Sequence, residues 1–281
     1  MTSGPIIVGI DGSPDGQRAL DWALTWSRAV AVPLSMVAAE PIPPGRKPDA
    51  PGIGDRAKAV VEAEQERLRA TSPDVAVDGR AEIAHPVTAL VNASQSAGAV
   101  VVGTKGTGGW RGTILGSVSG NTAASSYSPT VILPPTAPSA FDPSGPLVVG
   151  FDGSDASVAT ARLAIEAAAS EGRSVRLVQA DAGGSAPEEP LDEVVDGLRA
   201  AQPGVEVQLV TVEGRAVEVL TEHSAGAAFV VVASQGHRGV PGFLLGSTTR
   251  ELVQTSQAPV IVLTGRSKRL WPVGATAPDP S

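Results

Sequence analysis

Cysteine is absent from this chain of 281 residues, and aromatic residues make up only 3% of it. Without cysteine the protein can form no disulfide bond and can offer no thiolate as a nucleophile or metal ligand. Because aromatic side chains are scarce, alanine, valine, leucine and isoleucine must fill the core. This composition favours helices packed on a sheet whose buried strands are rich in valine and isoleucine.

The chain also lacks the features that nucleic-acid-binding and membrane proteins need. The formal net charge is −8 and no long basic run is present, which argues against an electrostatic surface for nucleic acid. No apolar run approaches the roughly 20 residues that span a bilayer, so we expect no membrane association. The first residues lack the basic and long apolar segments of a signal peptide, and we therefore expect a cytoplasmic protein. The three histidines show no paired spacing, so we expect no metal site.

What the sequence does contain is an internal repeat. Residues 8–13 read VGIDGS and match residues 149–154, which read VGFDGS. Residues 128–133 read SPTVIL and are similar to residues 258–263, which read APVIVL. Each copy is too long for a solenoid unit and has the size of a domain.

The repeat divides the chain into two domains with a connector between them. We assign residues 1–137 to the first domain and residues 146–265 to the second. Residues 138–145 form a proline-rich linker, for which we expect an extended, semi-rigid conformation. We expect residues 266–281 to form a tail that is mostly disordered.

Strand and helix patterns alternate along both copies. Buried strands are predicted in the first copy at residues 6–10, 34–39, 75–83, 99–102 and 130–133. The helices between them are expected at residues 15–31, 55–70 and 85–96, with a further one beginning at residue 117. The second copy predicts strands at residues 147–151, 175–180, 205–212, 229–232 and 260–263. This alternation predicts an α/β protein with two tandem Rossmann-like domains, each a five-stranded parallel sheet of order 3-2-1-4-5 flanked by helices.

A glycine-rich stretch, residues 103–119, follows the fourth strand of the first copy. It contains six glycines and leads into a helix at Ser117. Glycine lets backbone N–H groups approach a ligand closely, and a helix N-terminus attracts anions. The spacing of Gly103, Gly106 and Gly116 recurs as Ala233, Gly236 and Gly246 in the second copy. The alternative interpretation of the stretch is a flexible surface loop.

In a doubly wound sheet, ligands bind where the strand order reverses, which here lies between the first and fourth strands. Asp11 follows the first strand and the glycine-rich stretch follows the fourth, so both are expected at the same crevice. A carboxylate there can accept hydrogen bonds from a ribose, although Asp11 and Asp152 could instead form Asx turns or helix caps. Ser13 and Ser154 are predicted as helix N-caps.

Several further side chains are candidates for phosphate binding. In the first copy the hydroxyls of Ser117 and Ser119 are expected to donate hydrogen bonds, and Lys105 and Arg111 could neutralise charge or form a solvated surface. The equivalent candidates in the second copy are Asp152, Gly236, Gly246, Ser247 and Thr248, with His237 and Arg238 as the cations. Trp110 either covers the ligand or packs against the other domain.

The pattern Gly103-x2-Gly106-x9-Gly116-Ser117 after an apolar strand resembles the ATP-binding signature of the universal stress protein family. The resemblance covers nearly the whole chain and implies an adenine nucleotide alpha hydrolase-like fold. It implies one ATP per domain, which Mg²⁺ could accompany. In the first domain the resemblance places adenosine against Gly9, Asp11 and Ala39, and the phosphates against Gly103, Lys105, Gly106, Gly116, Ser117, Val118 and Ser119. In the second domain it places adenosine against Gly150, Asp152 and Ala180, and the phosphates against Ala233, Gly236, His237, Gly246, Ser247 and Thr248. Ala233 departs from the first glycine of the motif, which puts the second site in doubt.

The resemblance also implies pairing of the last strands, residues 130–133 and 260–263, as a pseudo-dimer within one chain, and it allows a homodimer. The expected function is that of an ATP-binding regulatory protein of the stress response, acting on an unknown protein partner with little or no turnover. No residue is an evident general base aimed at a γ-phosphate, so no catalytic residue is assigned. The alternatives are a slow ATP hydrolase and a nucleotide-free interaction module.

Overall fold

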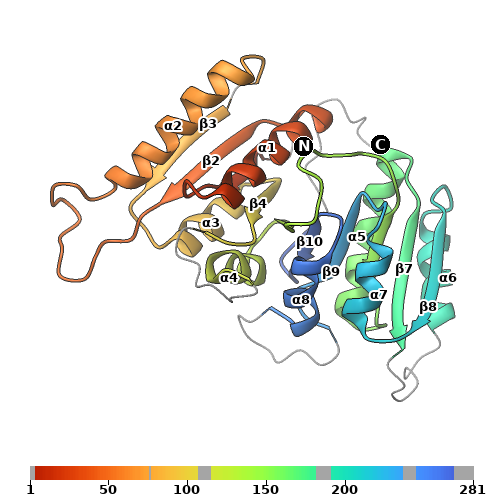
Figure 1. Cartoon of the computed structure of the whole chain (residues 1–281). Helices are drawn as coiled ribbons and strands as arrows, with labels where there is room; N and C mark the ends of the chain where they lie inside the picture. The colour runs from red at the N-terminus through yellow and green to blue at the C-terminus, as the bar shows by residue number, and fades with distance from the viewer. Residues whose placement is uncertain (1–3, 76, 107–114, 182–190, 237–244, 269–281) are drawn as a thin grey trace.

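The computed structural model describes residues 4–75, 77–106, 115–181, 191–236 and 245–268. The first domain follows the predicted alternation, with most element bounds within two residues of those expected. Its elements are β1 (Ile6–Gly9), α1 (Pro14–Val30), β2 (Leu34–Ala39), α2 (Asp55–Thr71), β3 (Val77–Glu82), α3 (Pro86–Ser94), β4 (Ala99–Gly103), α4 (Ser117–Ser125) and β5 (Thr130–Leu133). These elements occupy the left part of Figure 1.

The second domain repeats this order. Its elements are β6 (Leu147–Gly150), α5 (Asp155–Glu171), β7 (Val175–Asp181), α6 (Leu191–Ala201), β8 (Val207–Glu213), α7 (Ala216–His223), β9 (Phe229–Ala233), α8 (Ser247–Thr255) and β10 (Val260–Leu263). The glycine-loop residues Trp110, Arg111, His237 and Arg238 and residues 269–281 of the tail lie outside the described residues.

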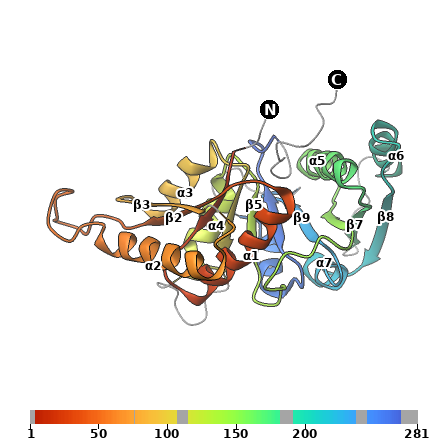
Figure 2. The same ribbon diagram turned by 90° about the horizontal axis from the view of Figure 1, so that it is seen from above.

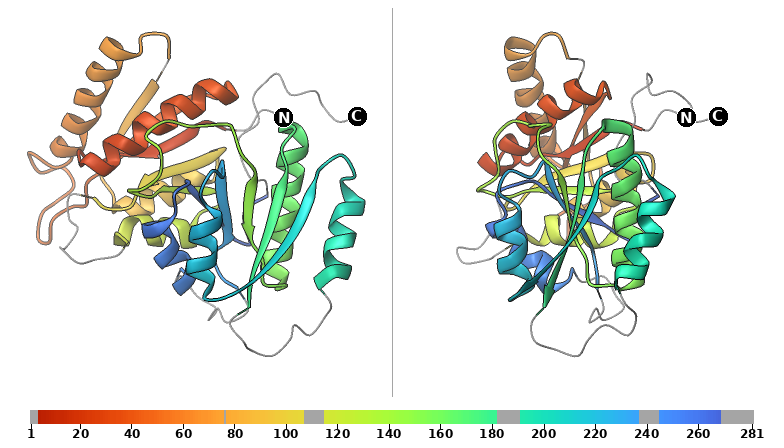
Figure 3. Two further views of the ribbon diagram at one scale, coloured as in Figure 1. Left: turned by 45° about the vertical axis from the view of Figure 1, so that its right-hand side comes forward. Right: turned by 90° about the vertical axis from the view of Figure 1, so that its right-hand side faces the viewer.

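The ten strands form a single sheet of order β3-β2-β1-β4-β5-β10-β9-β6-β7-β8. Each half therefore has the predicted order 3-2-1-4-5, and the pairings within each half are parallel. The two halves meet at β5 and β10, which pair antiparallel with Ile132 opposite Val260. This confirms the predicted pairing of the last strands within one chain. Figure 3 shows the strong twist of the joined sheet.

Helices cover both faces of the sheet because its strands are buried on both sides. On one face lie α1, α2, α5 and α6: α1 packs against side chains of β1 such as Ile6 and Val8, and α5 packs against side chains of β6 such as Leu147 and Val149. On the other face lie α3, α4, α7 and α8: α3 packs against Ile7 of β1, and α7 packs against Val148 of β6. The view from above places α2 at one end of the molecule and α6 at the other (Figure 2).

The turn after β1 explains why α1 begins where it does. The Ser13 side chain accepts a hydrogen bond from the Gly16 N–H and so caps α1, whose first residue is Pro14. Ser154 accepts a hydrogen bond from the Ser157 N–H in the same way at the start of α5. Both serines are therefore confirmed as N-caps, which satisfy backbone N–H groups that have no partner within the helix.

The linker packs against α1 instead of standing free as a spacer. The Arg18 guanidinium donates hydrogen bonds to the carbonyl oxygens of Leu133, Pro134, Pro135 and Ala137. Further along, the Phe141 N–H donates to the Thr25 hydroxyl at 2.7 Å. Side chains of α1 thus hold residues 133–137, which precede the linker, and also Phe141 within the linker.

An aromatic cluster joins the two domains on the same face. Trp22 and Trp26 of α1 lie against Phe141 of the linker and Phe229 of β9, with ring centroids 5.3 to 6.3 Å apart. Trp22 and Phe229 have no exposed surface. Although aromatic residues are few, four of them therefore form one core between the domains.

The segment between β2 and α2, residues 40–54, extends away from the sheet as a long loop (Figure 1).

Among the residues that the structure describes, no helix has the length and apolar character needed to cross a membrane.

Candidate functional site

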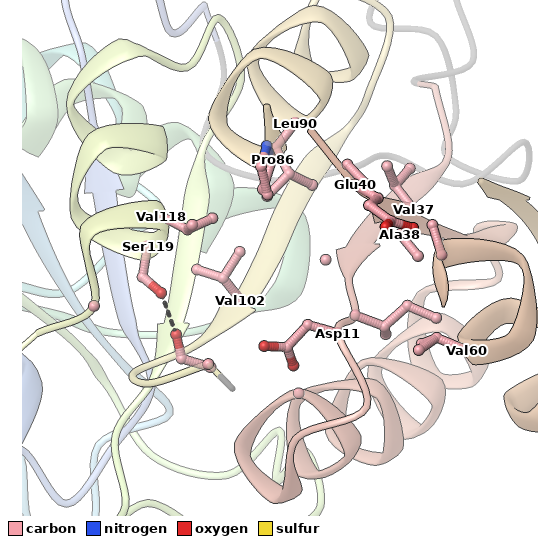
Figure 4. A pocket seen from close by; sticks show the side chains of 18 of the residues that line it. Asp11, Val37, Ala38, Glu40, Val60, Pro86, Leu90, Val102, Val118 and Ser119 are labelled. Carbon is pink, nitrogen blue, oxygen red and sulfur yellow. Dashed lines mark hydrogen bonds between the residues drawn. The ribbon is translucent and has the colours of Figure 1, made fainter. Parts of the chain in front are cut away.

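A cavity of about 560 Å³ lies at the carboxyl ends of β1, β2 and β4 in the first domain. This is the point at which the strand order of that half reverses, as the sequence predicts. Figure 4 shows Asp11 between two groups of lining residues, with Val118 and Ser119 on one side and Val37 and Glu40 on the other. The cavity is large enough for a small organic ligand.

Every candidate residue of the first domain that lines the predicted crevice and lies among the described residues contributes to this cavity, whereas Trp110 and Arg111 lie outside the described residues. The lining candidates come from four separate stretches of the chain and are Gly9, Asp11, Ala39, Gly103, Lys105, Gly106, Gly116, Ser117, Val118 and Ser119. The structure therefore brings together all the positions that the motif and the strand ends predict. That they bind a nucleotide stays a prediction.

Asp11 bridges the two sides of the crevice. Its Oδ1 atom accepts a hydrogen bond from the Ser13 N–H at 3.0 Å, which is the Asx turn considered from the sequence. Its Oδ2 atom lies against Gly106, where a Cβ atom would come within 2.5 Å of it. Both interpretations of Asp11 thus apply, because one carboxylate oxygen holds the turn and the other faces the glycine loop. A side chain at position 106 would therefore have to displace the Asp11 carboxylate.

The start of the glycine loop is tied to α1. The Asp15 Oδ2 atom accepts hydrogen bonds from the Thr104 hydroxyl at 2.8 Å and from the Lys105 N–H at 3.1 Å. A Cβ atom on Gly103 would lie 2.7 Å from the Asp15 backbone oxygen. The loop closes where the Gly116 N–H donates to the Thr104 oxygen at 2.8 Å. These contacts hold the loop at the edge of the cavity.

The helix α4 points its N-terminus at the cavity. Gly116 is its N-cap and has no side chain to cap the first N–H groups, which leaves them available to an anion. Ser117 is exposed at this end, as a phosphate donor would be. The Ser119 hydroxyl instead donates its hydrogen bond to the Gly103 oxygen at 2.7 Å. In this structure the proton of Ser119 therefore stabilises the loop, whereas the sequence predicts that it is offered to a phosphate.

Apolar side chains from four elements form much of the remaining cavity wall. Val37 of β2, Leu90 of α3, Val102 of β4 and Val118 of α4 all line the cavity (Figure 4). A Cβ atom on Gly9 would lie 3.0 Å from the Leu90 side chain, so glycine keeps this wall open. An apolar wall next to a few polar groups is typical of sites that bind a flat organic ring.

Sequence reasoning missed the polar residues contributed by neighbouring elements. Glu40 directly follows Ala39 and lines the cavity, as do Arg56 of α2 and His85, which precedes α3. The His85 Nδ1 atom accepts a hydrogen bond from the Val87 N–H, so His85 acts as an N-cap. Glu40 could have been predicted from the sequence, because it directly follows the candidate Ala39 at the end of β2. No local pattern points to Arg56, because the packing of α2 brings it to the cavity.

The second domain repeats the central contact of the site. A Cβ atom on Gly236 would lie 2.5 Å from the Asp152 Oδ2 atom, and Gly246 is the N-cap of α8 with its N–H donated to the Ser234 oxygen. Gly150, Ala180 and Ala233 lie at the ends of β6, β7 and β9, and Ser247 and Thr248 begin α8. The candidate His237 lies outside the described residues. Within the described parts of both domains, no group of histidine, aspartate and glutamate residues could hold a metal ion.

Comparison with known proteins identifies the class. The model of the universal stress protein family matches residues 3–134 and again residues 144–264. The chain therefore belongs to the universal stress protein family, in the form with two tandem domains.

The chain is similar to named members of this family. It is 33% identical to universal stress protein Rv2623 of Mycobacterium tuberculosis, over 92% of this chain and 95% of that protein. It is 31% identical to universal stress protein Rv1996 of the same species, over 92% and 94% of the two chains. Among solved structures, a universal stress protein from Archaeoglobus fulgidus superposes with a TM-score of 0.70 at 19% identity, covering 94% of this chain and 99% of that one. The last comparison shows the shared fold.

Proposed function

We propose that the first domain binds ATP and that the bound nucleotide regulates the protein in a stress response, with little or no turnover. The observation that carries this proposal is the cavity between Asp11, the apolar wall and the N-terminus of α4. Its three parts suit the three parts of a nucleotide: an apolar wall for the base, a carboxylate for the ribose hydroxyls and helix N–H groups for the phosphates.

The charges near the cavity fit this orientation. Lys105 and Ser117 are exposed beside the N-terminus of α4, where a cation and a hydroxyl can stabilise phosphate oxygens. Asp11 lies between this end and the end of β2, as a ribose-binding carboxylate should. Mg²⁺ would in that case be bound mainly by the phosphates and water, as is common for this ion.

We assign no general base to the site. The carboxylate nearest the glycine loop start, that of Asp15, already accepts two hydrogen bonds. A nucleotide held without a base to activate water is suited to setting a conformational or binding state. Slow ATP hydrolysis is the second candidate function, and ADP formed from added ATP would favour it. The cytoplasmic location, the homodimer and the protein partner stay predictions.

We propose a second ATP site in the second domain, weaker than the first. The contact between Asp152 and Gly236 repeats that between Asp11 and Gly106. Ala233 replaces the first motif glycine, and Asp152 is exposed where Asp11 is half-buried. A more exposed carboxylate is better hydrated and gains less from contact with a ligand.

Calorimetric titration of ATP into the wild type and into Gly116→Glu, Gly246→Glu and the double variant tests the proposal. Glutamate at either position places a negative side chain where phosphates would bind, so each single variant is expected to lose one site and the double variant both. Gly197→Glu is the matched control, because Gly197 is exposed on α6 with open space around it. Unchanged binding by the double variant would show that the motif is not the phosphate site. Chromatography of the nucleotide released on denaturation distinguishes bound ATP from its products.

A further inference from the structure

The helix α4, whose N-terminus faces the cavity, gains little stability from apolar packing. The residues that it buries are Ser119, Thr122 and Ala123. Those that α8 buries at the equivalent places are Thr249, Leu252 and Val253. The Thr122 hydroxyl is moreover inaccessible to solvent and has no hydrogen-bond partner among the described residues. Because a buried hydroxyl without a partner destabilises the structure around it, the core holds α4 less firmly than α8.

The sequence of α4 also contributes little helical stability of its own. The helix has nine residues, SVSGNTAAS, with Gly120 and Asn121 in its middle. Both residues are poorer helix formers than alanine. A helix of fewer than about 12 residues is marginal in water even when its sequence is favourable. The order of α4 therefore depends on the contacts made at its two ends.

The first domain itself holds the N-terminal end. The Gly116 N–H donates to the Thr104 oxygen at 2.8 Å, and the Ser119 hydroxyl donates to the Gly103 oxygen at 2.7 Å. Gly116 provides no side chain to cap the first turn of α4. An anion bound at this end would accept hydrogen bonds from the first N–H groups and would stabilise the helix.

The second domain holds the C-terminal end. α4 lies beside β10, and the chain that follows β10 reaches the last turn of α4. The Thr264 hydroxyl donates to the Ser126 oxygen at 2.8 Å, and the Arg266 guanidinium donates to the Ser125 oxygen at 3.0 Å. The same guanidinium lies over the Tyr127 ring, 4.8 Å from its centroid. A cation at the last carbonyl groups of a helix stabilises the helix.

The equivalent position in the first domain carries no charge. The Thr136 hydroxyl donates to the Ser256 oxygen at the end of α8, so each domain contacts the end of the other domain's helix. Thr136 is the residue equivalent to Arg266, and Gln257 is equivalent to Tyr127. The helix with the weaker packing is thus the one whose end receives an arginine from the other domain.

We propose that Arg266 is a positioning residue for the ATP site of the first domain, and that ATP binding in turn tightens the attachment of residues 264–268 to that domain. This inference rests on the proposed function. Phosphates at one end and Arg266 at the other both favour the helical form of α4, whose nine residues span about 13 Å. Two groups that favour the same state of one element strengthen each other's binding by the same factor. The second domain thereby responds to a nucleotide that it does not contact.

A comparison of ATP with adenosine tests this role, because adenosine has no phosphates to place at the N-terminus of α4. Both ligands are titrated by calorimetry into Gly246→Glu, which is expected to keep the first site, and into the same variant with Arg266→Gln. The stabilisation that a charge provides at a helix end corresponds to a change in affinity of about two- to fivefold. Arg266→Gln is therefore expected to weaken ATP binding by about this factor and to leave adenosine binding unchanged.

Lys268→Gln is the matched control, because Lys268 is exposed in the same segment and carries the same charge, whereas the charge that reaches α4 is that of Arg266. It should bind ATP as its parent does. Asn121→Ala provides a rescue. Asn121 is exposed on α4, and alanine is the best helix former, so its addition to Arg266→Gln should restore much of the lost ATP affinity.

Hydrogen exchange measures the reverse effect. The Arg266 N–H donates to the Thr264 hydroxyl, and the Ser267 N–H donates to the Thr264 oxygen. Saturating ATP should slow the exchange of both N–H groups, and saturating adenosine should not. Equal exchange with and without ATP would contradict the coupling.

The outcomes separate this inference from the proposed function. If the first domain binds no ATP, the proposed function fails and the role of Arg266 fails with it. If ATP binds but Arg266→Gln leaves its affinity unchanged, the site stands and Arg266 does not position α4. The same conclusion follows if Arg266→Gln weakens adenosine as much as ATP, or if Lys268→Gln weakens ATP as much as Arg266→Gln.

Discussion

Asp11 and Asp152 occupy equivalent places in the two domains, and each carboxylate leaves no room for a Cβ atom on the glycine that faces it, Gly106 or Gly236. Around this shared contact the domains differ. Asp15 in the first domain accepts hydrogen bonds from the start of the glycine loop, whereas the equivalent residue in the second is Ala156, which has no such acceptor. The motif alone therefore does not make two equal sites.

The first glycine of the motif shows why. A Cβ atom on Gly103 would lie 2.7 Å from the Asp15 backbone oxygen, so in the first domain glycine is required by the approach of α1. Ala233 carries that Cβ atom in the second domain, so we expect the start of α5 to lie farther from its loop. The glycine thus serves the packing of α1 on the loop in addition to lining the cavity.

The helix that covers the cavity also differs. α2 supplies Arg56, Ala57 and Val60 to the cavity wall of the first domain. In the second domain the described part of α6 starts with Leu191, whose side chain lies 2.5 Å from where a Cβ atom on Gly153 would be. Leu191 therefore packs directly onto the turn after β6. At the corresponding turn of the first domain, a Cβ atom on Gly12 would lie 3.4 Å from the Val60 side chain of α2.

The largest effect on stability is expected at Trp22 of α1, because the equivalent residue of α5 is not aromatic. Trp22→Ala should lower the free energy of unfolding by about 3–5 kcal/mol, because it removes a buried ring from the cluster between the domains. The equivalent position in α5 is Leu163, which is only partly buried, and Leu163→Ala should cost about 1–2 kcal/mol. Urea unfolding followed by circular dichroism measures both. Equal losses would show that the aromatic cluster does not make α1 the more important helix.

A smaller effect is expected from exchanging the first motif residue. Gly103→Ala should destabilise the protein by about 1–3 kcal/mol, because the added methyl group meets a backbone oxygen that cannot rotate away. Ala233→Gly should cost no more than about 1 kcal/mol, which is the entropic effect of glycine. Thermal unfolding and ATP titration of both variants provide the comparison. If Gly103→Ala is tolerated as well as Ala233→Gly, the close approach of α1 does not explain the glycine.

The smallest effect concerns the hydrogen bonds of Asp15. Asp15→Ala makes the first domain resemble the second and should lower stability by about 1 kcal/mol through the loss of two hydrogen bonds. Ala156→Asp is the matched reverse variant and should gain little, because the Ala233 methyl group keeps the helix from its loop. The double variant Ala156→Asp, Ala233→Gly should gain more than the sum of the single variants. Strict additivity would contradict this coupling.

The sequence alone predicted the repeat and the strand order 3-2-1-4-5 of each half. These features follow from local patterns: apolar runs of strand length, turn residues after Ile10 and Phe151, and the rule that alternating strands and helices pair in parallel. Asp11 and the glycine-loop positions could also be predicted, because strand ends and motif spacing mark the point where the strand order reverses. The pairing of β5 with β10 and the candidates Gly9, Ala39 and Val118 came only from the resemblance to the universal stress protein family.

Only the tertiary structure decided which side chains complete the site and what they contact. Arg56 reaches the cavity through the packing of α2, and Ser119 donates its hydrogen bond to the Gly103 oxygen. One oxygen of the Glu40 carboxylate is buried with no hydrogen-bond partner among the described residues. The attachment of the linker was likewise not predicted, since the Phe141 N–H donates to the hydroxyl of Thr25, which lies 116 residues away along the chain. Spacing along a sequence fixes the period of an element and its ends. Contacts between distant residues depend on how the helices are placed on the sheet, and no local pattern encodes that placement.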